Sequence, residues 1–118
     1  MGATIQKEDG NVRVLRITGI LKKSELDSVL EREEREWGPA TRIKVLAILE
    51  DFEGWERGAD WGDMTFFVSH DHQVEKIAVV ADPRWEAGVL MFAGAGVRRG
   101  PVKFFPSSQL AQARAWLG

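Results

Sequence analysis

Two segments of the chain are almost continuously apolar. They span residues 43–49 (IKVLAIL) and 76–81 (KIAVVA), and neither alternates between apolar and polar positions. Alternation is typical of a strand with one face in water, whereas an unbroken apolar run is typical of a strand covered on both faces. Both segments are therefore predicted to be central strands of a sheet that carries helices on its faces.

The N-terminal segment predicts a hairpin. Residues 3–8 and 12–18 have the composition of strands, and Asp9-Gly10 between them provides a tight turn in which glycine takes a positive φ. Gly19 is expected to end the second strand. The first strand should therefore run antiparallel to its partner.

A first helix is predicted over residues 24–37, with Ser24 as its N-cap. The apolar positions that share one face are Leu26, Val29, Leu30 and Trp37. The charged run 31–36 is expected to cover the opposite, solvated side.

Two more helices are predicted in the middle of the chain. The first spans about residues 60–70 and follows an acidic loop, 50–58, that contains Trp55. The second spans about 84–94, after a corner in which Asp82 can cap the helix and the following proline fits its first position.

A short strand, 102–105, and a final helix that begins near Ser107 complete the chain. The order of elements is β-β-α-β-α-β-α-β-α. Strands that alternate with helices predict an α/β fold, in which right-handed crossovers place helices on the faces of the sheet. We therefore expect one α/β domain over residues 1–118.

This pattern resembles the SpoIIAA-like family, small bacterial proteins with the STAS-type fold. Besides the order of elements, the resemblance rests on the opening hairpin, the acidic segment 50–52 (EDF) and the corner 81–85 (ADPRW). It implies a mixed five-stranded sheet flanked by four helices. It also implies open and closed arrangements of the helices, and contact with membrane lipids or non-polar molecules.

The sequence departs from the anti-sigma-factor antagonists of the same fold at one place. Those proteins carry a phosphorylatable Ser or Thr where the helix after the third strand begins. Here no hydroxyl residue occurs from Lys44 to Met64. A phosphorylation switch acts by adding charge at a helix start, so none is expected at this position.

Composition excludes several classes of function. The 118 residues carry 16 basic and 18 acidic side chains, and a net charge of −2 gives no overall field for holding nucleic acid. The absence of cysteine excludes disulfides and thiolate metal sites and suits a cytoplasmic location. The longest charge-free apolar stretch, 87–97, is far shorter than the roughly 20 residues of a membrane span. We expect no cofactor, and membrane contact that is peripheral at most.

The strongest chemical signal is an apolar surplus. Five Trp and six Phe residues occur, and the helix predicted at 84–94 is apolar nearly all round, so a single sheet face cannot cover it. We expect this helix to be a mobile element that contacts a non-polar ligand or a membrane lipid, or else a homodimer contact. The residues assigned to the site are Trp61, Met64, Phe67, Trp85, Val89, Leu90, Met91 and Phe92, with Arg98 and Arg99 as head-group partners.

Two other functions are weighed against this one. A protein–protein regulatory module would dock through the same helices, with the acidic segment 50–60 setting specificity. An enzyme would use Asp51 or His70, but no Gly-x-Ser-x-Gly elbow occurs. On a helix, His70 and His72 would point apart and could reach one ion only where the helix has ended. They lie at the predicted helix end, and a surface helix terminus is expected there in preference to a metal site. Gly94, Gly96 and Gly100 follow a helix, whereas the glycines of a phosphate loop join a strand to the start of a helix. We therefore expect a non-enzymatic protein.

Overall fold

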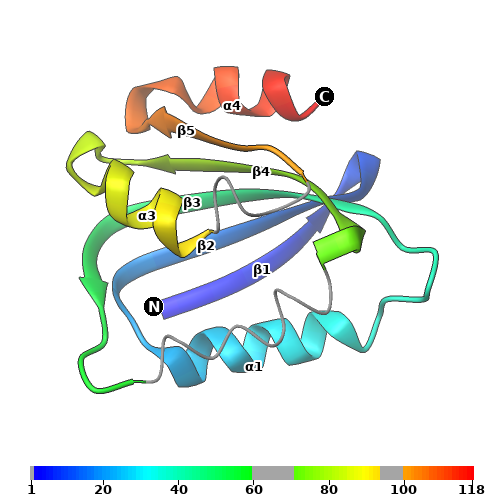
Figure 1. The fold of residues 1–118 in the computed structure, drawn as a ribbon, viewed down its shortest axis with the longest axis horizontal. Coiled ribbons are helices and arrows are strands. Elements are labelled where there is room, and N and C mark those ends of the chain that lie inside the picture. The colour runs from blue at the N-terminus through cyan, green and yellow to red at the C-terminus, as the bar shows by residue number, and fades with distance from the viewer. Residues whose placement is uncertain (1, 60–70, 94–99) are drawn as a thin grey trace.

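The computed structural model describes residues 2–59, 71–93 and 100–118, which form a five-stranded sheet with helices on both faces (Figure 1). The strands are β1 (Gly2–Glu8), β2 (Val12–Leu21), β3 (Ile43–Trp55), β4 (Val74–Ala81) and β5 (Val102–Pro106). The α-helices are α1 (Lys23–Glu34), α3 (Glu86–Phe92) and α4 (Leu110–Leu117). Short 3-10 helices are η1 (Asp9–Asn11), η2 (Asp71–Gln73), η3 (Pro83–Trp85) and η4 (Ser107–Gln109).

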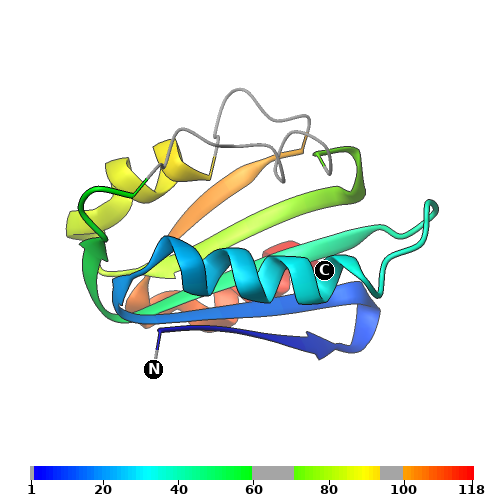
Figure 2. The same cartoon turned by 90° about the horizontal axis from the view of Figure 1, so that it is seen from below.

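The strands lie in the sheet in their sequence order. β1 pairs antiparallel with β2, as the hairpin predicts, and all other neighbours are parallel. Because each parallel strand is added on the same side of the previous one, right-handed crossovers place the connecting helices on one face. α1 and α3 pack on that face, and α4, which follows the last strand, packs on the other (Figure 2). The expected mixed five-stranded α/β sheet is confirmed.

Each face of the sheet has its own apolar core. The core under α1 and α3 includes Ile17, Leu21, Leu26, Ala47, Val79 and Val89. The core under α4 includes Val14, Leu46, Ala78, Phe105 and Leu117. Successive side chains of β3 and β4 point to opposite faces, so these two strands supply both cores. This is why their sequences show no alternation.

Three α-helices lie within the described residues, whereas four helices were expected for the whole chain. The helix expected at about 60–70 lies outside the described residues. The helix expected at 84–94 is divided into η3 and α3. Its predicted cap is confirmed, because Oδ1 of Asp82 accepts a hydrogen bond from the Arg84 N–H at 3.0 Å.

The strand ends differ from the predictions. β2 does not end at Gly19 but continues to Leu21, because Gly19 adopts a φ of 69° at an irregularity that bends the strand without ending it. β3 continues through the predicted acidic loop to Trp55. Trp55 is therefore a strand residue and not a loop residue.

The helix caps also differ. The N-cap of α1 is Lys22 and no side chain caps it, so Ser24 lies inside the first turn. α1 ends at Glu34, three residues before the predicted end at Trp37. Ser107 lies within η4, whose N-cap is Pro106 and which has no side-chain cap.

Candidate functional site

An apolar cavity of about 100 Å³ lies on the face of the sheet that carries α1 and α3. Its floor is made by alternate side chains of the strands, among them Leu15, Ile17, Val45, Ala47, Leu49 and Val79. Leu26 and Leu30 of α1 and Val89 and Phe92 of α3 form its walls. We call this space the α1–α3 cavity. Among the described residues that line it, only Arg13 and Glu33 carry charge.

Aromatic rings close one end of the α1–α3 cavity. The ring of Phe52 lies edge-on to Trp55 and Trp85, with centroid distances of 5.1 and 4.9 Å. Trp55 in turn lies 5.8 Å from Phe92 of α3. Edge-to-face ring pairs contribute about 0.5–1.5 kcal/mol each beyond their buried area. Within the described part of the chain, the indole nitrogens of Trp55 and Trp85 are buried without a hydrogen-bond partner, so the contact of Trp55 with Phe92 is one between apolar ring surfaces.

An irregular pairing of β2 with β3 positions this aromatic end. Thr18, Gly19 and Ile20 lie opposite Glu50, Phe52 and Gly54 of β3. The two residues between these partners, Asp51 and Glu53, therefore have no partner on β2. Such bulges bend a strand and increase its twist. Gly19 and Gly54 have φ values of 69° and 110°, which side-chain-bearing residues rarely adopt. The bend directs the end of β3 towards α3.

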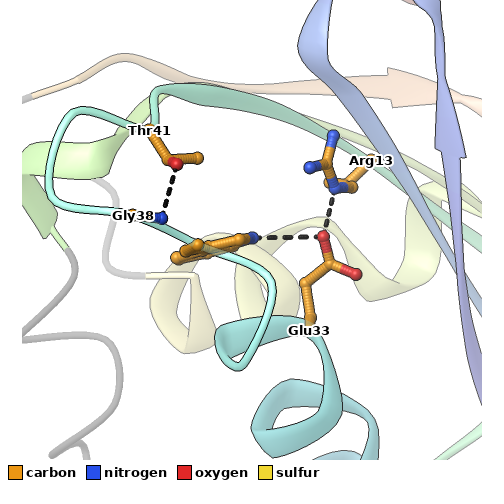
Figure 3. A network of polar contacts seen from close by, with 5 residues as sticks. Arg13, Glu33, Gly38 and Thr41 are labelled. Carbon is orange, nitrogen blue, oxygen red and sulfur yellow. Dashed lines mark hydrogen bonds and ion pairs between the residues drawn. The ribbon is translucent and has the colours of Figure 1, made fainter.

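The opposite end of the cavity holds a buried ion pair (Figure 3). Oε1 of Glu33 accepts a hydrogen bond from Nε of Arg13 and another, at 3.1 Å, from Nε1 of Trp37. The side chains of Arg13 and Glu33 are only 8% and 11% exposed. Nη1 of Arg13 is buried and has no hydrogen-bond partner among residues 2–59, 71–93 and 100–118. At the polar end, the described residues therefore leave one donor without an acceptor.

The connection between α1 and β3 is held by its own hydrogen bonds. The Gly38 N–H donates to Oγ1 of Thr41 at 2.9 Å (Figure 3). The buried Gln73 donates from Nε2 to the carbonyl oxygens of Gly38 and Thr41 at 3.1 and 3.2 Å. These contacts tie the turn to the start of β4 and so keep Trp37 beside Glu33.

A second, polar cleft of about 450 Å³ lies at the carboxyl ends of the parallel strands. This edge is where α/β sheets commonly place their binding sites. Arg16 and Glu50 pair there at 2.9 Å, and Asp82 and Arg84 also line the cleft. Asp51 adopts a φ of 50°, a left-handed conformation that few residues other than glycine adopt. The cleft is therefore suited to polar contacts.

The predicted site residues fall into three groups. Val89 and Phe92 line the α1–α3 cavity, with Val89 only 3% exposed. Met91 is 81% exposed and Leu90 is half-buried, so α3 presents an apolar side to its surroundings. Trp85 packs on Phe52 and lines the polar cleft instead of the cavity. The other predicted residues, Trp61, Met64, Phe67, Arg98 and Arg99, lie outside the described residues.

The polar end of the cavity was not predicted from the sequence. Arg13 shares its side of β2 with Leu15 and Ile17, two and four residues further on, and this alternation could have placed it on the apolar face. Glu33 follows Leu26 by seven residues and Leu30 by three, which is helical spacing on the buried face. The prediction that the whole charged run is solvated is therefore wrong at Glu33.

The metal and acid–base hypotheses from the sequence concern His70, His72 and Asp51. No group of three or more His, Asp or Glu residues capable of holding a metal ion occurs among residues 2–59, 71–93 and 100–118. His72 is exposed on η2 and Asp51 is exposed at the polar cleft. His70 lies outside the part of the chain that is described.

The comparisons with known proteins agree with the fold and with this arrangement of elements. The SpoIIAA-like family model matches residues 12–118, so the chain belongs to the SpoIIAA-like family. An uncharacterized protein of the DUF3478 family with a SpoIIAA-like fold, from Shewanella loihica PV-4, is similar in structure with a TM-score of 0.74. The similarity covers 99% of this chain and 93% of that one at 18% sequence identity, so it supports the fold alone. No curated protein matches the sequence significantly.

None of the described helices has the length and apolar character needed to cross a bilayer.

Proposed function

We propose that this protein is a non-enzymatic binding module of the STAS type that holds a non-polar small molecule in the α1–α3 cavity. The observation that carries the proposal is the composition of the cavity wall. Among its described residues the single pair of opposite charges, Arg13 and Glu33, is neutralised internally, and nearly every other side chain is apolar. Concave sites with an apolar wall and few polar groups are the usual form of small-molecule sites.

α3 is the wall that moves in this proposal. It has seven residues, of which only Val89 is fully buried. Phe92 of α3 contacts Trp55 of β3 through a pair of rings, and such a contact can shift without the loss of a hydrogen bond. Displacement of α3 from Trp55 would open the cavity without breaking a strand pairing.

Benzene is a suitable probe because an engineered apolar cavity of about 150 Å³ is known to bind it. Methyl-group NMR during a benzene titration should shift the signals of Leu15, Val45 and Val89 together. Ala47→Leu places three more carbons in the cavity and should abolish the shifts. Ala115→Leu adds the same atoms at an exposed position of α4 and should leave the benzene-induced shifts unchanged. Unchanged methyl signals in the wild-type protein would refute the proposal.

We also propose that the exposed Met91 of the same helix contacts a membrane lipid or a second copy of the chain. Met91→Asp should abolish flotation with vesicles of anionic and zwitterionic phospholipid, and it should shift a sedimenting dimer to monomer. Ser108→Asp adds the same charge at an exposed position of η4 and serves as the matched control. Wild-type protein that neither floats nor dimerises would refute this part of the proposal while leaving the cavity intact.

The polar cleft favours a second candidate, a regulatory module that binds a protein. Glu50, Asp51 and Asp82 give the cleft three carboxylates beside two guanidinium groups, which suits a partner with a basic segment. A photo-crosslinking residue at position 51 should then capture one protein partner in cells, whereas the same residue at position 115 should not. Equal capture at both positions would refute the second candidate.

A further inference from the structure

Two polar atoms on residues that line the α1–α3 cavity have no hydrogen-bond partner among the described residues, Nη1 of Arg13 and Nε1 of Trp55, and only Nη1 belongs to a charged group. Arg13 is 7% exposed, and its Nε already donates to Glu33. A guanidinium carries five N–H donors, and a buried donor without an acceptor is costly. Native structures keep few such groups, so each one requires an explanation. Arg13 lines the cavity, but Nη1 itself is covered by protein atoms, so an acceptor oxygen in the cavity reaches it only when neighbouring side chains shift.

The charge at this end of the cavity is already balanced. The carboxylate of Glu33 compensates the guanidinium of Arg13, and no other charged residue lines the described wall of the cavity. A ligand carboxylate would therefore bring a second, uncompensated negative charge into an apolar space, at a large desolvation cost. A neutral oxygen, such as that of a ketone, an ester or an alcohol, accepts the hydrogen bond without that cost.

The shape and size of the cavity limit the rest of the ligand. Its floor follows β3 from Ile43 to Leu49, a distance of roughly 20 Å at about 3.3 Å per residue, although the volume is only about 100 Å³. A small volume bordered by residues along seven positions of one strand suits an unbranched chain better than a fused ring system. An apolar cavity of about 150 Å³ accommodates benzene, so a chain of about six carbons is the size to expect here.

We propose that the α1–α3 cavity selects a short, unbranched aliphatic molecule with one neutral oxygen acceptor, and that Nη1 of Arg13 donates a hydrogen bond to this oxygen. The inference rests on the proposed function and names its ligand class. The chain of the ligand lies along β3 towards the aromatic end, and its oxygen lies at the Arg13 end. Because Nη1 is enclosed by protein atoms, the neighbouring apolar side chains move slightly when the oxygen reaches it.

Three six-carbon probes separate the contributions of chain, oxygen and charge. They are hexane, 2-hexanone and hexanoate, titrated against methyl-labelled protein. The wild-type protein should bind 2-hexanone about tenfold more tightly than hexane, which is the size of one net hydrogen bond, and hexanoate more weakly than 2-hexanone. Equal affinity for hexane and 2-hexanone would overturn the inference but leave the proposed function standing. No binding of hexane, 2-hexanone or benzene would overturn both.

Two variants test the role of Arg13. Arg13→Lys keeps a cation opposite Glu33 but has no second nitrogen, so it should lower the affinity for 2-hexanone to that of hexane and leave hexane unchanged. Glu33→Gln keeps the guanidinium and removes the compensating charge, so it should reverse the preference in favour of hexanoate. If Arg13→Lys fails to fold, the relative affinity of Glu33→Gln for hexanoate and 2-hexanone is the test of the inference. A loss of all three probes together in Arg13→Lys, or an unchanged ranking in Glu33→Gln, would overturn the inference.

Discussion

The guanidinium of Arg13 on β2 is paired with the carboxylate of Glu33 in the last turns of α1, and both side chains are about nine-tenths buried. Removal of one partner leaves the other as an uncompensated charge in an apolar setting, at a typical cost of about 3–5 kcal/mol. We therefore expect Glu33→Ala to lower the free energy of unfolding by that amount. Urea denaturation followed by tryptophan fluorescence measures it.

The double variant Arg13→Leu/Glu33→Leu is the matched control. It removes both charges and keeps an apolar volume, and such replacements are often neutral or stabilising. Its free energy of unfolding should lie within about 1 kcal/mol of the wild-type value. A double variant as unstable as Glu33→Ala would mean that packing around Trp37, and not the buried charge, accounts for the loss.

The two central strands and the cap at Asp82 could be predicted from the sequence, because a local sequence pattern is sufficient to identify each of them. Residues 43–49 and 76–81 are apolar throughout, and only a strand covered on both faces requires that pattern. The Asp82 cap could likewise be predicted, because the cap and the following proline are adjacent in sequence and act on the same turn.

Features that depend on distant partners could not be predicted in the same way. The second half of β3 has a period-two pattern, with Phe52 and Gly54 buried and Asp51 and Glu53 exposed, but its acidic and glycine residues are typical of a loop. This segment forms a strand because it pairs with β2, which lies far away in the sequence, across an irregularity in the pairing. The cavity between α1 and α3 depends on how two helices far apart in sequence share one sheet face, which no local pattern specifies.

The ion pair between Glu8 and Arg114 predicts a pH dependence of stability. Arg114 of α4 donates to the Glu8 carboxylate at 2.7 Å, and this hydrogen bond lowers the pKa of Glu8 below its ordinary value of 4.5. A carboxyl group whose pKa is lower in the folded state contributes stability above its unfolded pKa and loses it as the pH falls through the folded value. Because the pair is exposed, the contribution should be small and sensitive to salt.

The measurement for Glu8 is a comparison with Glu8→Gln across pH. The wild-type protein should be slightly more stable at pH 7, and the difference should shrink below pH 4.5 as Glu8 becomes protonated. Added salt should reduce the difference at pH 7 as well. A difference that stays constant from pH 7 to pH 3 would contradict an electrostatic origin.

Gly100 has no room for a side chain. A Cβ at this position would lie 2.3 Å from the carbonyl oxygen of Glu75, which is backbone and cannot turn away. Gly100→Ala should therefore separate the start of β5 from β4 and destabilise the protein by about 1–3 kcal/mol, as overpacking commonly does. Thermal unfolding of both variants measures the effect. Gly38→Ala, whose Cβ would lie 3.9 Å from Oγ1 of Thr41, should change stability much less than Gly100→Ala.

Gly88 of α3 lies directly against the ring of Trp55, so it tests whether α3 is the moving wall. A Cβ there would lie 3.0 Å from Cη2 of Trp55, closer than an ordinary contact. Alanine favours the helix by about 1 kcal/mol over glycine, so Gly88→Ala should stay folded while α3 or the ring is displaced. Benzene affinity should then change at least several-fold.

In a Trp55→Phe background, where the smaller ring leaves room for the Cβ, the same substitution should have no further effect on binding. Equal effects in both backgrounds would show that Gly88 acts through the helix backbone, and the contact between Trp55 and α3 would then have no part in opening the cavity.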